Sequence, residues 1–398
     1  MDNHIWITGL GVASSIGINV KENLSSLISG KRGLGPVQIL DTIHRDSFRV
    51  GEIPLSDQQM MEILEIPTSR YKAYTRTSLI GMIAAREALL SSGSDPGDGV
   101  PTALVSATTV GGMDKTEREF SGANVDSGFV STHPCGDSTN KIADFLGVEG
   151  YRTTLSTACS SGANALIHAA RLIKHGHVER AVVGGVDALS KFTLNGFNSL
   201  MIIDPDECRP FDRNRKGLNL GEGAGFLVLE SDRLAAKDQN RRMCRLSGYA
   251  NANDAHHQTA SSPDGQGAYD AMMEALALAE VTPDEIDYIN AHGTGTENND
   301  ASEGAALVRV FGDRLPPLSS TKSFTGHTLG AAAGIEAVFS VLAIREGILF
   351  PEPGFEEAME SPSIRPLTQV EQGVNIRHVL SNSFGFGGNN STLIFSKT

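Results

Sequence analysis

Short runs rich in β-branched residues alternate with longer helical runs along this chain of 398 residues, and no other feature limits its fold as strongly. This alternation is typical of α/β proteins, in which helices cover the faces of a sheet. Strands are expected at residues 5–9, 102–106, 153–156, 181–184, 226–229, 286–290, 379–382 and 391–395. Helices are expected at residues 78–91, 161–175, 267–280 and 330–346.

Two segments of the chain echo each other. Residues 155–162 (LSTACSSG) lead from an expected strand through a turn of small residues into a helix, and residues 318–326 (LSSTKSFTG) do much the same. Two similar halves that meet near residues 231–245 would fit the length of the chain. The shared Ser, Thr and Gly content of the two segments could equally arise by coincidence, so the echo alone does not decide between these interpretations.

The charge balance and the apolar pattern exclude several classes of protein. With 33 Lys and Arg against 47 Asp and Glu, the net charge is −14, whereas a surface that grips nucleic acid is basic. The longest apolar stretch, residues 329–344, contains Glu336 and is too short to span a membrane. Residues 1–4 lack the basic start of a secretory leader. We therefore expect a cytoplasmic protein that binds neither nucleic acid nor membrane.

Cys159 has the setting of a nucleophile. It lies in T-A-C-S-S-G, where an expected strand turns into an amphipathic helix. Unpaired N–H groups and the dipole at a helix start lower the pKa of a thiol and favour the reactive thiolate. The alternative is a buried structural cysteine, which is how we interpret Cys135, Cys208 and Cys244. The four cysteines show no CxxC spacing and do not suggest a disulfide framework, which fits a reducing compartment.

Two histidines and a lysine form the next candidates. His292 lies in N-A-H-G-T-G-T directly after residues 286–290, at a strand end where α/β folds expose their chemistry. Lys322 and His327 lie in K-S-F-T-G-H, just before an expected helix. Each histidine could instead be a hydrogen-bonded structural residue, and the lysine a surface charge. No HxxxH or CxxC cluster accompanies them, so we expect no metal site.

A Gly-rich segment, residues 382–390 (NSFGFGGNN), links the last two expected strands. Such a turn can present backbone N–H groups to a phosphate or to an oxyanion. Glycine hairpins without this role are common, so the segment is a weak signal when it stands alone.

Taken together, these motifs resemble the β-ketoacyl-acyl carrier protein synthases of the elongating type I/II class, within the thiolase-like superfamily. The matching segments, in the family's order, are TACSSG (157–162), GEGAG (221–225), NAHGTGT (290–296), KSFTGH (322–327) and NSFGFGG (382–388). The resemblance implies a thiolase fold, an α/β fold of two similar βα halves in a five-layer α-β-α-β-α sandwich. Residues 1–235 would form the half with the nucleophile. Residues 236–398 would form the half with the His, Lys and His residues and the Gly-rich gate loop.

The implied activity is that of a 3-oxoacyl-[acyl-carrier-protein] synthase, an acyltransferase of fatty acid elongation. An acyl chain passes from the phosphopantetheine of an acyl carrier protein to a cysteine, and malonyl-carrier then loses carbon dioxide and attacks the acyl thioester. The carrier supplies the phosphopantetheine, so no cofactor of the enzyme's own is expected, and the family usually forms homodimers. A specialised polyene or polyketide ketosynthase would use the same chemistry. A non-condensing partner of the chain-length-factor type is a further alternative, although such proteins lack the nucleophilic cysteine.

The resemblance assigns the chemistry to four residues. Cys159 matches the nucleophile, and His292 and His327 match the pair that binds the malonyl thioester oxygen and stabilises the enolate. Phe386 matches the gate over the acyl pocket. Its backbone N–H, together with that of Cys159, would form an oxyanion hole for acyl transfer.

Further positions would organise the site and bind substrate. Lys322 matches the lysine that organises the site electrostatically, with Glu303 as its acidic partner and Asp300 in support. The positions matched to substrate binding are Val110, Phe197, Thr259, Thr294, Thr296 and Phe384. The candidates for docking the acidic carrier are Arg70, Lys72, Arg209 and Arg213. Arg209 and Arg213 could instead belong to a structural turn and pair with acidic residues of the chain itself.

Two positions depart from the usual pattern of the fatty-acid members. Met201 stands where many carrier-docking members have Arg, and Asn389 stands where Thr is common. Neither departure touches the chemistry, but both favour the specialised polyene or polyketide alternative.

Overall fold

Ten of the described strands are hydrogen-bonded in one series, which divides into two halves, each a sheet of five strands. The structure, a computed structural model, describes residues 4–119 and 131–397. In that part of the chain, the first half has the spatial order β5 (Arg152–Leu155), β4 (Thr102–Ala107), β6 (Arg180–Asp187), β7 (Gly223–Ser231) and β1 (Ile5–Ser14). The second half has the order β10 (Leu318–Ser319), β9 (Tyr288–Asn290), β13 (His378–Gly385), β14 (Asn389–Ser396) and β8 (Cys244–Asn253). Between the halves, β1 and β8 pair at Trp6 with Arg245 and at Ile7 with Cys244.

Strand direction repeats in the two halves. In the first half β5, β4 and β6 run parallel, and β7 and β1 are antiparallel to their neighbours. In the second half β10, β9 and β13 run parallel, and β14 and β8 are antiparallel to theirs. The two halves therefore have the same topology, which confirms the fold expected from the resemblance.

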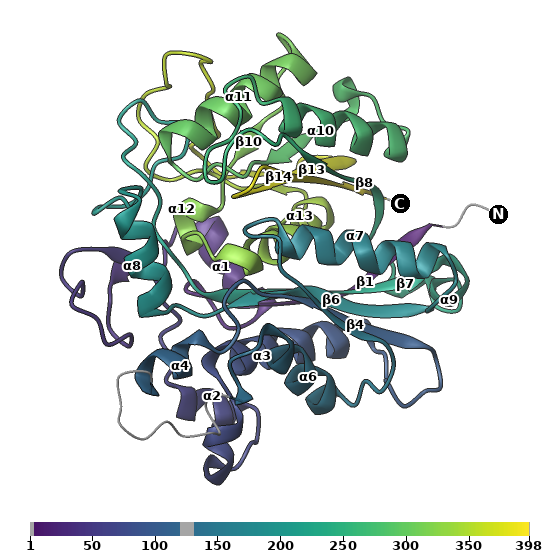
Figure 1. Cartoon of the computed structure of the whole chain (residues 1–398). Helices are drawn as coiled ribbons and strands as arrows, with labels where there is room; N and C mark the ends of the chain where they lie inside the picture. Colours follow the sequence, from purple (N-terminus) through teal and green to yellow (C-terminus); the bar gives the residue numbers. More distant parts are fainter. Residues whose placement is uncertain (1–3, 120–130, 398) are drawn as a thin grey trace.

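Helices cover both faces of each half (Figure 1). The central layer consists of α7 (Ser161–Lys174) and α13 (Ala332–Glu346), which lie between the two sheets. The outer layers are α3 (Arg76–Ser92) with α6 (Cys135–Leu146) on one side, and α10 (Gln266–Ala279) with α11 (Glu297–Phe311) on the other. Because α13 is enclosed by both sheets, all of its residues before Arg345 are buried, as expected for a helix that is apolar all round.

Close backbone contacts in the central layer explain part of the glycine content. A Cβ on Gly162 at the start of α7 would lie 2.9 Å from the backbone nitrogen of Gly334 in α13. A Cβ on Gly225 of β7 would lie 2.3 Å from the carbonyl carbon of the same Gly334. Such distances leave no room for a side chain, so these glycines allow α13 to pack directly against α7 and β7.

The remaining elements are short and connect these layers. They are α1 (Val20–Ser29), β2 (Leu34–Pro36), β3 (Arg49–Gly51), α2 (Asp57–Ile63), η1 (Thr68–Ala73), α4 (Met113–Glu119), α8 (Lys191–Ser199), α9 (Asp232–Ala235), η2 (Gln239–Arg241), η3 (Pro283–Glu285), α12 (Lys322–Thr325), η4 (Leu329–Ala331), β11 (Ile348–Leu349) and β12 (Glu371–Gln372). None of the described helices is long and apolar enough to cross a membrane.

Candidate active site

The nucleophile candidate lies at a strained elbow between β5 and α7. Ala158, the residue before Cys159, has a φ of 53°, a left-handed conformation that few non-glycine residues adopt. The N–H of Thr157 donates to the hydroxyl of Ser161 at 2.8 Å, and that hydroxyl donates to the carbonyl of Ala158 at 2.5 Å. These two bonds close the turn and place Cys159 two residues before the first residue of α7, with 6 % of its surface exposed.

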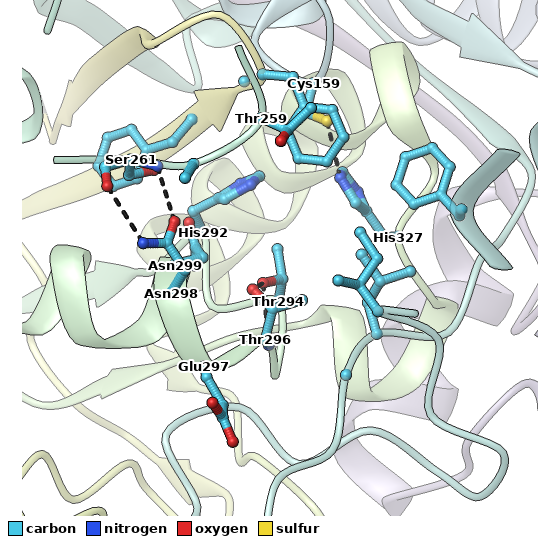
Figure 2. A pocket seen from close by; sticks show the side chains of 18 of the residues that line it. Cys159, Thr259, Ser261, His292, Thr294, Thr296, Glu297, Asn298, Asn299 and His327 are labelled. Carbon is cyan, nitrogen blue, oxygen red and sulfur yellow. Dashed lines mark hydrogen bonds between the residues drawn. The ribbon is translucent and has the colours of Figure 1, made fainter. Parts of the chain in front are cut away.

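Two histidines from the second half face the cysteine (Figure 2). His292 follows β9, and His327 lies in the turn between α12 and η4. The Nε2 of His327 is 3.0 Å from the Sγ of Cys159. The two imidazole rings meet edge to face with centroids 5.4 Å apart. Residues separated by more than 130 positions in the sequence thus form one cluster, as the resemblance predicts.

Lys322 fixes the orientation of His292. Its Nζ donates to the carbonyl oxygen of His292 at 2.6 Å and lies 3.2 Å from Nδ1 of the same residue. Since an ammonium group can only donate, Nδ1 accepts and the ring hydrogen of His292 is on Nε2. Burial and the charge of Lys322 hold the pKa of His292 well below its usual value, so the ring is neutral.

The acidic partner of Lys322 differs from the one expected. Its Nζ forms an ion pair with Glu336 of α13, and both side chains are almost completely buried. Glu303, the expected partner, instead accepts hydrogen bonds from the backbone N–H groups of His292 and Gly293, at 2.9 and 2.8 Å. The assignment of Glu303 as the ion-pair partner of Lys322 is therefore wrong.

Glu303 and Asp300 of α11 hold the loop that carries His292. Asp300 accepts from the backbone N–H groups of Thr294 and Gly295 at 3.1 and 3.2 Å, next to the pair held by Glu303. Burial raises the pKa of Glu303 to about 7, against the lowering effect of its donors. The two carboxyl groups thus position the loop through its backbone and do not face the sulfur.

The thiol of Cys159 is not the thiolate expected from its place at a helix start. Burial raises its pKa to about 12, against the lowering effects of Lys322 and of the backbone N–H of Phe386. Burial and the charge of Lys322 also hold the pKa of His327 well below its usual value. A neutral thiol therefore lies beside a neutral imidazole, and Nε2 of His327 is placed to accept the thiol proton.

Two cavities meet at Cys159, and Phe386 lines both. The first has a volume of about 400 Å³, and among its lining residues are both histidines and the expected substrate-binding residues Thr259, Thr294, Thr296 and Phe384. Figure 2 shows Thr294 and Thr296 next to the two histidines.

The second cavity has a volume of about 330 Å³ and includes the expected pocket residue Val110. Phe197 lines both cavities, and its ring stacks on that of Phe386 with centroids 5.7 Å apart. The two phenylalanines therefore stand between a polar entrance and an apolar chamber.

The four candidate docking residues fall into two groups. Arg209 pairs with Glu356 at 3.1 Å, and Arg213 pairs with Glu357 at 2.8 Å. The alternative interpretation of these two arginines, internal pairing with acidic residues, therefore describes the structure. Arg70 and Lys72 lie on the exposed surface of η1, where the guanidinium of Arg70 is 5.5 Å from the ring centroid of Tyr74.

Comparison with known proteins identifies the family. The family description "Beta-ketoacyl synthase, N-terminal domain" matches residues 2–235, and "Beta-ketoacyl synthase, C-terminal domain" matches residues 243–356. The chain belongs to the β-ketoacyl synthase family. It is therefore a condensing enzyme of the acyltransferase type.

Relatives of known function support this placement in the β-ketoacyl synthase family. The chain is 30 % identical over 412 residues to 3-oxoacyl-[acyl-carrier-protein] synthase 2 of Staphylococcus aureus strain N315, covering 100 % of this chain and 99 % of the relative. It is 33 % identical over 406 residues to Nodulation protein E of Rhizobium leguminosarum bv. trifolii, covering 99 % of each.

Among solved structures, this β-ketoacyl synthase resembles the ishigamide ketosynthase/chain length factor, with a TM-score of 0.93 and 32 % identity over 100 % of this chain and 99 % of that one. It also resembles the ketosynthase ApeO, solved with its chain length factor ApeC from Xenorhabdus doucetiae. There the TM-score is 0.87 and the identity 31 %, over 100 % of this chain and 98 % of that one.

Sequence reasoning missed Glu336 as a site residue. The signal was present, because a single carboxyl group interrupts an apolar stretch of the length of a buried helix. A charged residue in such a stretch requires a buried partner of opposite charge, and Lys322 is that partner.

Proposed function

We propose that this enzyme condenses an acyl chain held on Cys159 with a malonyl group delivered by an acyl carrier protein, in fatty acid elongation. The observation that carries the proposal is the meeting of two cavities at one sulfur atom. An apolar chamber suits an acyl chain, and a polar entrance lined by threonines suits the pantetheine arm. The carrier would supply the phosphopantetheine, and we propose a cytoplasmic homodimer.

In the first half-reaction, the sulfur of Cys159 attacks the carbonyl carbon of the acyl thioester. The thiol proton passes to Nε2 of His327, which lies 3.0 Å away, and then to the sulfur of the departing pantetheine. The backbone N–H groups of Cys159 and Phe386 would stabilise the oxyanion of the tetrahedral intermediate. The acyl chain then occupies the chamber beyond Phe386.

In the second half-reaction, malonyl-carrier enters the polar cavity. Its thioester oxygen accepts from Nε2–H of His292, which Lys322 keeps in this tautomer. While Nε2 of His327 accepts the thiol proton, the ring hydrogen is on Nδ1, which is buried and has no hydrogen-bond partner among the described residues. Once Cys159 carries the acyl group, transfer of this hydrogen to Nε2 would leave no buried N–H unpaired and would provide the second donor. Loss of carbon dioxide leaves an enolate stabilised by these donors, and its carbon attacks the acyl thioester and releases Cys159.

The test is a panel of acyl-carrier proteins offered with malonyl-carrier protein, with products identified by mass. Wild-type enzyme should form the 3-oxoacyl-carrier two carbons longer than the acyl donor. Cys159→Ala should abolish condensation, whereas Cys159→Gln should lose condensation but still decarboxylate malonyl-carrier. Cys135→Ala is the matched control, because Cys135 lines neither cavity, and should behave as wild type. Wild-type condensation by Cys159→Ala would refute the proposal.

A second candidate is a specialised polyene or polyketide ketosynthase that works with a chain-length-factor-type subunit. The specific observation is the wall of the acyl chamber formed by α8 and the residue after it, where Phe192 is 59 % and Leu200 is 42 % exposed. Exposed apolar side chains of this size commonly mark a partner surface. Light scattering combined with the same assay distinguishes the candidates. Condensation by the purified chain as a homodimer supports the first, and loading of Cys159 without condensation supports the second.

A further inference from the structure

Three asparagines form a cluster at the base of the Gly-rich loop. Asn389 is the first residue of β14, directly after the loop, Asn251 lies on the neighbouring strand β8, and Asn164 lies in the first turns of α7. The loop itself consists of Phe386, Gly387 and Gly388 between β13 and β14. The cluster therefore joins three elements that surround the nucleophile elbow.

The side-chain oxygen of Asn389 is the centre of this cluster. It is 2.7 Å from Nδ2 of Asn251 and 3.0 Å from Nδ2 of Asn164, both of which donate to it. The hydroxyl of Ser160, the residue after the nucleophile, lies 2.9 Å from the same oxygen. One amide oxygen thus accepts from strand β8, from helix α7 and from the elbow itself.

The cluster continues into the elbow. Asn164 also donates to the hydroxyl of Thr157 at 2.9 Å, and its own oxygen accepts from Asn251 at 3.0 Å. The Nδ2 of Asn251, whose two hydrogens face the oxygens of Asn389 and Asn164, is also 2.9 Å from the hydroxyl of Ser391. Because each amide has at least two partners, the side chains fix one another in a single arrangement.

The rest of the loop is held through its backbone: the N–H of Gly387 donates to the carbonyl of Gln258 at 2.8 Å, and the carbonyl of Gly388 accepts from the N–H of Asp254 at 3.1 Å. Gly387 and Gly388 have φ values of 84° and 75°, which glycine adopts without strain. At the elbow side, a Cβ on Gly385 would lie only 3.2 Å from the backbone nitrogen of Cys159. A small displacement of the loop base would therefore change the distance between the N–H of Phe386 and the sulfur directly.

We propose that Asn389 is a positioning residue that holds the base of the gate loop in register with the nucleophile elbow. With the base held in this way, the backbone N–H of Phe386 keeps its hydrogen bond to the sulfur of Cys159. This inference rests on the proposed function. The cluster serves the loading of Cys159 and not the decarboxylation of malonate, which uses the two histidines.

The experiment compares the two half-reactions in single variants and in a double variant. Loading of Cys159 is measured by intact-protein mass with octanoyl-pantetheine, and decarboxylation by carbon dioxide release from malonyl-pantetheine. Asn389→Ala should slow loading about tenfold. The variant loses hydrogen bonds between neutral groups, and the energy of about one such bond corresponds to a factor of about ten in rate. Decarboxylation should stay within about twofold of wild type in the same preparation, because the histidines keep their own supports.

Two further variants make the result specific. Asn251→Ala should slow loading as well, and the double variant Asn251→Ala/Asn389→Ala should be no slower than Asn389→Ala alone, because both remove one network. Asn240→Ala, which removes an exposed asparagine in η2, should match wild type in both assays.

Wild-type loading by Asn389→Ala, equal loss of both half-reactions, or additive losses in the double variant would each overturn the inference. Failure of the wild-type enzyme to load Cys159 from octanoyl-pantetheine or from acyl-carrier protein would refute the proposed function itself, and the inference with it. Loading by wild type with undiminished loading by Asn389→Ala refutes the inference alone.

Discussion

Breaking the ion pair between Lys322 and Glu336 should lower the stability of the folded protein. The exposed fractions of the two side chains are 2 % and 3 %, so Glu336→Gln leaves a buried ammonium without a counter-charge. Removing one partner of a buried pair typically costs about 3–5 kcal/mol of unfolding free energy. For 398 residues the entropy of unfolding is roughly 0.8 kcal/mol/K, so the melting temperature should fall by about 4–6 °C.

A matched control lies on the same helix. Arg345 and Glu346 form an ion pair at the end of α13, with side chains that are 45 % and 34 % exposed. Exposed pairs contribute about 0–1 kcal/mol, so Glu346→Gln should change the melting temperature by about 1 °C or less. Differential scanning calorimetry at one fixed protein concentration gives both values, since dimerisation would make the melting temperature depend on concentration.

The double variant Lys322→Met/Glu336→Leu separates stability from chemistry. Replacing both charges by apolar groups of similar size removes the unpaired charge, so most of the lost stability should return. Decarboxylation of malonyl-carrier should not return, because Nδ1 of His292 has lost the donor that fixes its tautomer. Additive losses of stability in the double variant, or a wild-type melting temperature for Glu336→Gln, would refute the reasoning.

The remaining predictions concern the two half-reactions and the carrier. His292→Ala and His327→Ala should each slow malonyl decarboxylation by about 10²–10³-fold. Only His327→Ala should also slow loading, because of the two histidines only His327 has its Nε2 beside the sulfur. Equal effects of the two variants on loading would contradict this. Alkylation of Cys159 by iodoacetamide should rise about tenfold per pH unit from pH 7 to pH 9, because a thiol with a pKa raised to about 12 is protonated throughout this range; a plateau below pH 8 would indicate a thiolate. Arg70→Glu combined with Lys72→Glu should raise the KM for acyl-carrier and weaken its salt dependence without changing kcat, and unchanged KM would place carrier docking elsewhere.

The sequence located the candidate reacting groups better than it located the residues that support them. Cys159, His292 and His327 lie in short motifs whose residue types indicate their chemistry. The structure brings all three residues together. The partner of Lys322 was missed, because the single carboxyl group in the apolar stretch at Glu336 signals a buried ion pair but does not show which cation packs against it. A contact between distant elements depends on packing, which a single sequence does not display.

Elements with weak local patterns were the ones missed in the fold. All eight expected strands occur, but β8 was not expected, since its sequence CRLSGYANAN contains Gly, Ser and two Asn and lacks the usual β-rich character. Its strand conformation comes from pairing with β14 over eight residue pairs. Helix α11 was also missed, because it begins with the polar run ENNDASEG, in which Asp300 and Glu303 are buried and hold the loop of His292.

The thiol of Cys159 shows why a rule based on local sequence can predict the wrong direction for a pKa shift. The partial positive charge at a helix start lowers the pKa of a nearby thiol, but its effect falls off within the first turn. Burial acts on the whole side chain and has the larger effect here, so the pKa rises to about 12 and does not fall. The protein therefore needs a base within reach of the sulfur, and the contact between Cys159 and Nε2 of His327 supplies it. In the proposed mechanism the same burial would keep water away from the acyl thioester, so the condition that keeps the resting thiol protonated would also protect the loaded enzyme from hydrolysis.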